Sequence, residues 1–143
     1  MKKYNMEFYI SDDKGLLDFD RVHKEVKDSY WGGYRTKEMT LTTIENSWCF
    51  GIYSKNEGQV GFARLITDKL VFAYIMDVII FDPFKGKGLG KMLMEHILEN
   101  SEIKQVQTVA LKTKDAHGLY EAFGFQKVGD SEMWMAKDKA KYD

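Results

Sequence analysis

The chain has 143 residues, the size of one ordinary domain, and 44% of them are hydrophobic, which supplies one substantial core and excludes disorder. The net charge of -1 gives no basic field that would attract nucleic acid or an anionic membrane. The single cysteine, Cys49, excludes an internal disulfide, and no apolar run is long enough for a signal peptide or a membrane span. We therefore expect a cytoplasmic protein with one domain, residues 1–143.

The N-terminal part of the chain predicts one strand and two helices. Residues 6–11 read as a short strand. Apolar residues then recur at helical spacing from Phe19 to Tyr30, and the two glycines that follow end this helix. A weaker helical pattern covers residues 36–47, with Thr36 as its N-cap.

The rest of the chain predicts strands that alternate with helices. Strand-like runs cover residues 48–54, 60–67, 71–81, 106–113 and 132–137, and helical patterns begin at Leu89 and cover 116–123. Hairpin strands followed by a β-loop-α-β-α-β order predict a mixed sheet flanked by helices.

The residues between a strand and the helix that starts at Leu89 read KGKGLG, with a glycine at every second position. The spacing matches neither a P-loop nor a dinucleotide-binding fingerprint. A strand, a glycine turn and a helix N-terminus nevertheless point several backbone N–H groups at one anion. The alternative is a glycine-rich turn with solvated lysines. The strand-turn-helix context favours a pyrophosphate site.

These residues resemble the Q/R-x-x-G-x-G/A motif of the GCN5-related N-acetyltransferases, the GNAT family, which binds the pyrophosphate of acetyl-coenzyme A. The segment TKDAHGLYEAFGF is similar to the family's second signature, and the resemblance runs from about Phe8 to Met135. It implies an α/β fold of the α+β kind. Its mixed, mostly antiparallel central sheet would have six to seven strands and about four flanking helices.

The resemblance also implies binding roles for particular residues. The strand around Val78 to Ile80 would splay from its neighbour and pair its backbone with the pantetheine arm. A backbone N–H there, that of Val78, would bind the thioester carbonyl. Tyr120 would lie near the coenzyme sulfur. The implied coenzyme-binding residues are Val78, Ile79, Ile80, Lys85, Gly86, Lys87, Gly88, Leu89, Gly90, Lys91 and Tyr120.

Thioester aminolysis needs a neutral amine, a stabilised oxyanion and a leaving thiolate. An alkylamine has a pKa of about 10.4, so roughly one molecule in a thousand is deprotonated at neutral pH, and a base or a water relay must collect a proton. Asp77, a carboxylate inside an apolar strand, is the candidate base. The alternative for Asp77 is an ion pair with Arg64 or a lysine, or a role in shaping the strand.

Tyr120 is the second candidate catalytic residue. A phenol near pKa 10 that protonates a thiolate of thiol pKa near 8.5 does so uphill by about 2 kcal/mol. We therefore expect Tyr120 to stabilise the nascent thiolate through a hydrogen bond. The alternative is a core tyrosine that packs with its helical neighbours.

Aromatic residues cluster around the break after the first helix, where the resemblance implies an acceptor pocket. Tyr30 and Trp31 are the candidate acceptor-binding residues, and simple core packing is the alternative. His117, at the start of the short helix with Tyr120, is a further candidate. His23 and His96 fall among charged helix residues and predict surface or groove positions. No residue cluster has metal-ligand spacing, so we expect no metal.

The sequence therefore predicts an acetyl-coenzyme A-dependent N-acetyltransferase that acts by direct attack in a ternary complex. Cys49 lies in an interior strand pattern, so a covalent acetyl-enzyme is not expected. The expected partner is a small-molecule or peptide amine, with no nucleic acid or membrane, and the resemblance allows a homodimer. The alternative functions are a non-catalytic acyl-coenzyme A sensor and a pure interaction domain.

Overall fold

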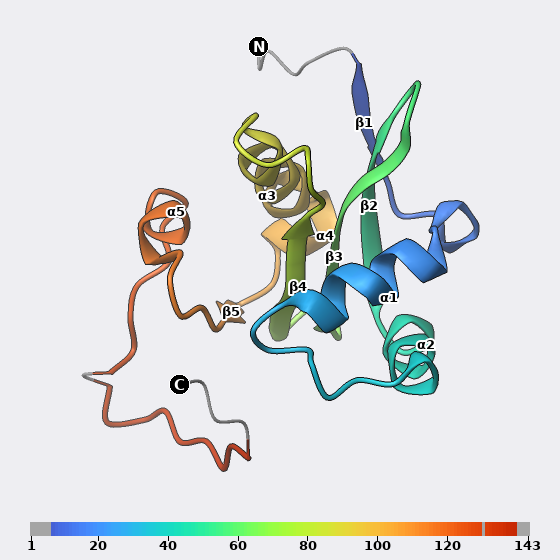
Figure 1. Ribbon diagram of the computed structural model, residues 1–143. Helices are drawn as coiled ribbons and strands as arrows, with labels where there is room; N and C mark the ends of the chain where they lie inside the picture. The colour runs from blue at the N-terminus through green and yellow to red at the C-terminus, as the bar shows by residue number, and fades with distance from the viewer. Residues whose placement is uncertain (1–6, 130, 140–143) are drawn as a thin grey trace. The chain divides into compact units, whose positions relative to one another are not determined.

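The computed structural model describes residues 7–129 and 131–139. These residues divide into two compact units, one ending at Leu111 and the other beginning at Lys112. All strands of the described chain lie in the first unit (Figure 1). The single domain expected over residues 1–143 stays a prediction.

The first unit carries the sheet and most of the helices. Its elements are β1 (Phe8–Ser11), η1 (Lys14–Leu16), α1 (Phe19–Asp28), α2 (Lys37–Glu45), β2 (Trp48–Ser54), β3 (Gly58–Thr67), β4 (Phe72–Ile80), α3 (Leu89–Glu99), α4 (Ser101–Lys104) and β5 (Thr108–Leu111). The strands lie in the order β1-β2-β3-β4-β5, antiparallel except for the parallel pair β4–β5. The mixed α/β fold with a mostly antiparallel sheet is as predicted.

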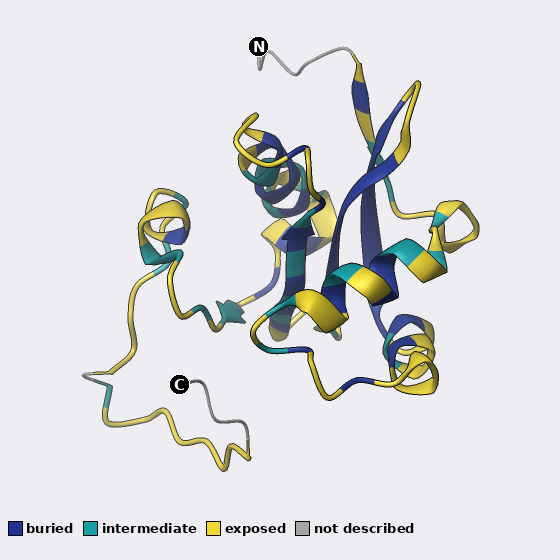
Figure 2. Ribbon diagram, in the orientation of Figure 1, coloured by how far each residue is buried: buried dark blue, intermediate teal, exposed yellow. Residues whose placement is uncertain are grey.

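Helices cover both faces of the sheet (Figure 1). On one face, α1 and α2 pack over β2, β3 and β4 through a buried cluster that includes Val22, Val26 and Phe62. On the other face, α3 packs through a second cluster that includes Phe84 and Leu89. Figure 2 shows the buried residues concentrated along β2 and β3, between these two layers. The sheet is therefore fixed from both sides, and β4 is held between the two helical layers.

Helices α1, α2 and α4 begin at side-chain caps that the sequence encodes. Asp18 accepts a hydrogen bond from the N–H of Arg21 at the start of α1, and Thr36 accepts one from Met39 at the start of α2, as predicted. The short helix α4 was not predicted from the sequence. Its signal is the Asn100 side chain, which accepts a hydrogen bond from the N–H of Glu102.

The prediction of six to seven strands is wrong, because the described residues form five. The predicted strand over residues 132–137 is absent, and Met133 and Met135 are 89% and 94% exposed. The alternating pattern of these residues fits a strand, but a strand also needs a partner edge. No ladder is formed by residues 132–137 in the structure.

Candidate functional site

The glycine turn leaves β4 and enters α3 between two buried anchors. Phe81 and Phe84 are both buried, and Phe84 packs with Leu89 of α3. Between the anchors, the chain passes through Gly86 and Gly88, whose φ angles are 83° and 78°. An L side chain rarely adopts such angles, so glycine is required for this path. The turn is exposed, as a ligand-binding turn must be.

The N-terminus of α3 presents backbone donors that have no acceptor among the residues described in the structure. The first helical hydrogen bond runs from the N–H of Met92 to the carbonyl of Gly88 at 3.1 Å. No side chain caps the helix at Gly88. In the described part of the chain, the N–H groups of Leu89, Gly90 and Lys91 therefore have no acceptor. An anion on this turn would meet these donors and the positive end of the helix dipole.

The lysines of the turn add positive charge around these donors. Lys85, Lys87 and Lys91 are exposed. Lys85 lies 3.5 Å from a carboxylate oxygen of Asp82, and both side chains are largely solvated. Such an exposed pair contributes little to stability, so Lys85 remains available to a stronger anionic partner.

Strand β4 has an open edge next to the turn. It pairs with β5 over Phe72–Ile75 only, and the register ends at the pair Ile75 and Leu111. On that side, Met76–Ile80 have no strand partner within the described residues. The expected splay of β4 from its neighbour and the expected contact with a pantetheine arm both stay predictions.

The backbone N–H groups of Ile80 and Val78 face this open edge. The N–H of Phe81 donates to the carbonyl of Val60 at 2.8 Å, in the direction of β3. The N–H groups of successive residues in a strand point to alternate edges. Counting back from Phe81, the N–H groups of Ile80 and Val78 therefore point away from β3. Two donors therefore line the open edge immediately before the glycine turn.

A β-bulge precedes these donors. Between the pairs Phe62–Ile79 and Arg64–Met76, β3 contributes one residue and β4 contributes two. Asp77 lies in this bulge with a φ of 52°, a left-handed conformation that is uncommon for a residue with a side chain. Asp77 directly precedes Val78 in the chain, and its side chain is buried.

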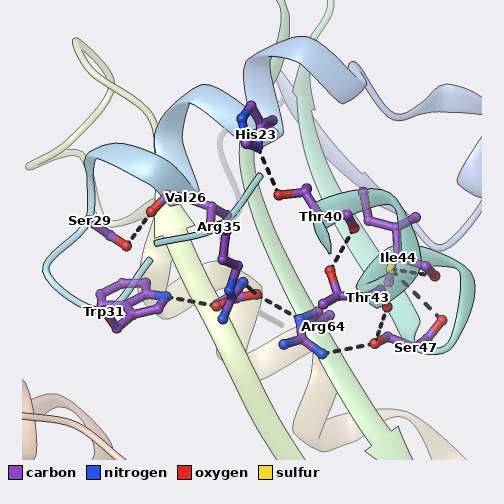
Figure 3. A network of polar contacts seen from close by, with 12 residues as sticks. His23, Val26, Ser29, Trp31, Arg35, Thr40, Thr43, Ile44, Ser47 and Arg64 are labelled. Atoms are coloured by element: carbon purple, nitrogen blue, oxygen red, sulfur yellow. Dashed lines mark hydrogen bonds and ion pairs between the residues drawn. The ribbon is translucent and has the colours of Figure 1, made fainter. Parts of the chain in front are cut away.

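Three donors surround the carboxylate of Asp77 in the interior of the first unit. Trp31 Nε1 donates to Oδ1 at 2.7 Å. Arg35 Nη1 and Arg64 Nε both donate to Oδ2, each at 2.6 Å. Arg64 Nη1 also donates to the hydroxyl of Ser47 at 3.0 Å. Figure 3 shows Trp31, Arg35 and Arg64 converging from the α1–α2 loop and from β3.

This network opposes the expected role of Asp77 as a general base. Burial by itself would raise the pKa of the Asp77 carboxyl, but the Arg35 hydrogen bond and the charges of Arg64 and Arg35 outweigh it, so the pKa is lowered. A carboxylate held in this way is a weak proton acceptor at neutral pH. The structure thus contains the alternative that we gave for Asp77, an ion pair with Arg64.

The candidate acceptor residues differ in their surroundings. Tyr30 is about half exposed, and its ring meets that of Trp31 edge to face at a centroid distance of 4.8 Å. Trp31 is partly buried, and its indole N–H donates a hydrogen bond to Asp77. Tyr34 is largely exposed on the same loop. The aromatic cluster therefore has both a partly buried and a solvent-facing member.

The second unit contains Tyr120 and His117, both on α5 (His117–Glu121). Tyr120 is buried, and its ring meets that of Phe125 edge to face at 6.0 Å. His117 is the first residue of the helix and is partly exposed. The expected proximity of Tyr120 to the coenzyme sulfur and of His117 to the acceptor stays a prediction.

The remaining titratable candidates are placed in the core. Burial raises the pKa of the Cys49 thiol to about 11, so this residue is a protonated core thiol at neutral pH. His23, for which we expected a surface or groove position, is buried, and its Nδ1 is 2.8 Å from the hydroxyl of Thr40. Among the described residues, no three metal-binding side chains come together, and no helix is long and apolar enough to cross a membrane.

Sequence reasoning missed two members of the network, Arg35 and Ser47. Arg35 stands directly before the N-cap Thr36 and has no periodic pattern that marks it as buried. Ser47 is the last residue of the helical pattern predicted over residues 36–47, and a serine at a helix end has no feature that marks it as buried. A usable signal existed only at Arg64, an arginine in the middle of an apolar strand.

Comparisons with known proteins fit this geometry. The family model described as an acetyltransferase (GNAT) domain matches residues 46–127. A solved structure from Xanthomonas campestris pv. campestris, assigned to the GNAT acetyltransferases, is 31% identical, superposes with a TM-score of 0.86, and the match covers 92% of each chain.

Two sequence relatives are also named as N-acetyltransferases. The uncharacterized N-acetyltransferase ycf52 of Porphyra purpurea is 28% identical over 129 residues, which cover 87% of this chain and 73% of the relative. The chloroplastic serotonin N-acetyltransferase 2 of rice (Oryza sativa subsp. japonica) is 30% identical over 107 residues, which cover 71% of this chain and 54% of the relative.

Proposed function

Since the chain belongs to the GNAT acetyltransferase family, we propose that it transfers the acetyl group of acetyl-coenzyme A to a primary amine by direct attack in a ternary complex. The observation that carries the proposal is the row of unused backbone donors at the N-terminus of α3, directly after an exposed turn with two left-handed glycines. The coenzyme pyrophosphate would be bound by the N–H groups of Leu89, Gly90 and Lys91, with Lys85 and Lys87 beside it.

The open edge of β4 supports the position of the acyl group. The N–H groups of Val78 and Ile80 face this edge, next to the glycine turn. A pantetheine arm that runs from the turn along this edge would accept hydrogen bonds from these donors. The N–H of Val78 would then stabilise the oxyanion as the amine attacks the thioester carbonyl.

In the proposed step, the amine nitrogen forms a bond to the acetyl carbon. The carbon–sulfur bond breaks, and the electron pair leaves with sulfur as a thiolate. Tyr120 donates a hydrogen bond to that thiolate. The proton of the attacking amine leaves through water, because Asp77 is paired with Arg35 and Arg64 and is a poor acceptor.

A second function is favoured by one observation: the carboxylate that we expected to act as a base is held in ion pairs. A chain without an effective base could bind an acyl-coenzyme A and not turn it over, which is the alternative of a sensing module. Its discriminating property is tight coenzyme binding without acetyl transfer.

Calorimetric titration with acetyl-coenzyme A and a free-thiol assay with a panel of primary amines separate these functions. Binding with amine-dependent thiol release supports the acetyltransferase. Binding without thiol release with any amine supports the sensor. No binding of acetyl-coenzyme A by the folded protein would overturn both functions and leave the interaction domain.

A further inference from the structure

The glycine turn is held at its base by a residue of α1. Arg21 lies in the first turn of α1, and its Nη2 donates to the carbonyl of Asp82 at 2.6 Å. Its guanidinium carbon lies 4.9 Å from the centroid of the buried Phe81 ring. One side chain thus contacts both residues that follow β4, at the point where the chain enters the turn.

Other contacts fix Arg21 in this position. Its Nε lies 3.4 Å from a carboxylate oxygen of Glu25, one helical turn along α1, and its backbone N–H donates to the N-cap Asp18 at 3.2 Å. The N–H of Asp18 in turn donates to the buried side chain of Gln59 in β3 at 2.7 Å. The guanidinium is therefore placed by the helix and the sheet, and not by the turn that it contacts.

The carbonyl that Arg21 binds lies where the path of the turn is set. The preceding carbonyl, that of Phe81, accepts the N–H of Phe84 at 2.7 Å. Two successive carbonyls at the base of the turn are thus held, one from within the turn and one from α1. They fix the orientation of the planar peptide groups from which the chain continues to Gly86 and Gly88.

The contact also ties down the far end of the segment with the open-edge donors. The N–H groups of Val78 and Ile80 lie in the chain between Asp77 and Asp82. Asp77 is held by the two buried arginines of its network, and Asp82 is held by Arg21. The segment that carries these donors is therefore fixed to the rest of the first unit immediately before and immediately after it.

We propose that Arg21 is a positioning residue for the coenzyme: it holds the base of the turn, so that the donors of β4 and those of α3 keep the spacing that one coenzyme molecule requires. The inference rests on the proposed function. Arg21 acts through the backbone of the turn and does not itself bind the pyrophosphate. Because the turn is ordered when the protein folds, coenzyme binding does not have to supply the free energy of ordering it.

Calorimetric titration of Arg21→Gln with acetyl-coenzyme A tests the proposal. We expect binding to weaken by about tenfold, as the loss of a charge-assisted hydrogen bond predicts. Arg21→Lys keeps a charged donor but not the planar fork, so it should restore part of the affinity. A role confined to the stability of α1 would lower the free energy of unfolding and leave the affinity of the folded protein unchanged.

Two control substitutions and a change of salt exclude a general effect of charge. Lys24→Gln removes the same charge from an exposed position of α1, where Lys24 lies 3.0 Å from Asp28. Asp82→Asn keeps the carbonyl that Arg21 binds. Neither control should weaken binding. Raising the salt from about 0.05 to 0.5 M screens a long-range attraction between Arg21 and the pyrophosphate, whereas the loss caused by a displaced turn persists.

Hydrogen exchange of the protein without coenzyme gives a measurement that does not depend on binding. In Arg21→Gln, the amide of Phe84, which is bonded to the base of the turn, should exchange several times faster, and the amides of β2 should not change. Should Arg21→Gln fail to fold, Arg21→Met serves for both measurements, because it removes the donors and keeps an unbranched stem against Phe81.

The outcomes keep the two proposals apart. Wild-type affinity in Arg21→Gln, or a loss of affinity that disappears at high salt, overturns the positioning role and leaves the acetyltransferase intact. Unchanged exchange at Phe84 also overturns it. No binding of acetyl-coenzyme A by the wild-type protein overturns the proposed function, and with it the purpose that we assign to Arg21.

Discussion

Arg64 and Asp77 form an ion pair across the bulge between β3 and β4, with Arg64 Nε donating to Asp77 Oδ2 at 2.6 Å. The pair lies in the core, and Arg35 shares the same oxygen. This arrangement ties the α1–α2 loop to the strand that precedes the glycine turn. Substitutions in the network and in the turn can therefore be tested separately.

Asp77→Asn should destabilise the protein by about 3–5 kcal/mol, because it leaves two buried guanidinium groups without a counter-charge. Urea unfolding followed by circular dichroism measures the change. Asp82→Asn is the control, since it removes a carboxylate from an exposed pair with Lys85 and should change stability by less than about 1 kcal/mol. Equal effects of the two substitutions would contradict a structural role of the network.

The stability that Asp77 supplies should depend on pH. Its pKa is lowered in the folded protein by Arg35 and Arg64, against about 3.9 in an unfolded chain. The stabilisation is therefore complete above the unfolded value and is lost as the pH falls through the folded value. Unfolding of wild type and Asp77→Asn from pH 7 downward should show a constant difference until about pH 4 and a smaller one below it. A difference that grows on acidification would refute the assignment.

Gly88→Ala should weaken acetyl-coenzyme A binding by roughly tenfold or more, because an alanine resists the left-handed φ that aims the helix donors at the pyrophosphate. Calorimetry measures the binding constant. Gly58→Ala is a matched control, since Gly58 has the same φ of 78° but lies at the start of β3. It should reduce stability by a similar amount and leave coenzyme affinity unchanged.

Tyr120→Phe should lower turnover by roughly ten- to a thousand-fold with little change in coenzyme affinity, because it removes a hydrogen bond to the leaving thiolate and keeps the ring packed on Phe125. Steady-state kinetics and a coenzyme titration measure the two quantities. Tyr9→Phe on the edge strand β1 serves as the control for loss of a hydroxyl. Unchanged turnover in Tyr120→Phe would remove Tyr120 from the mechanism.

If Trp31 lines the acceptor pocket, as we propose, Trp31→Ala should raise the KM for the acceptor far more than the KM for acetyl-coenzyme A, because it removes the aromatic ring and the hydrogen bond to Asp77. Trp31→Phe keeps an aromatic ring and removes only the indole N–H, so it should show a smaller effect. Initial rates over a grid of both substrate concentrations measure the two KM values. Equal effects on both substrates would defeat the assignment to the acceptor site.

The sequence by itself determined the features that depend on local pattern. Helical spacing identified α1, Thr36 marked the start of α2, and alternating glycines located the turn before α3, because capping and left-handed φ are properties of a few adjacent residues. The resemblance to the GNAT family rested on the same local motifs. The prediction of a strand over residues 132–137 was wrong, since a strand needs a partner edge and no local pattern specifies one.

The tertiary structure alone decided the surroundings of Asp77. Arg35 and Trp31 lie 42 and 46 residues away from it in the chain, and nothing in their own segments marks them as partners. They meet because a bulge turns Asp77 inward where α1 and α2 pack on the sheet. We had expected the Asp77 carboxylate to accept protons, but the tertiary structure pairs it with two arginines. In the low-dielectric interior, the proton affinity of a carboxylate depends strongly on the charged groups that pack against it.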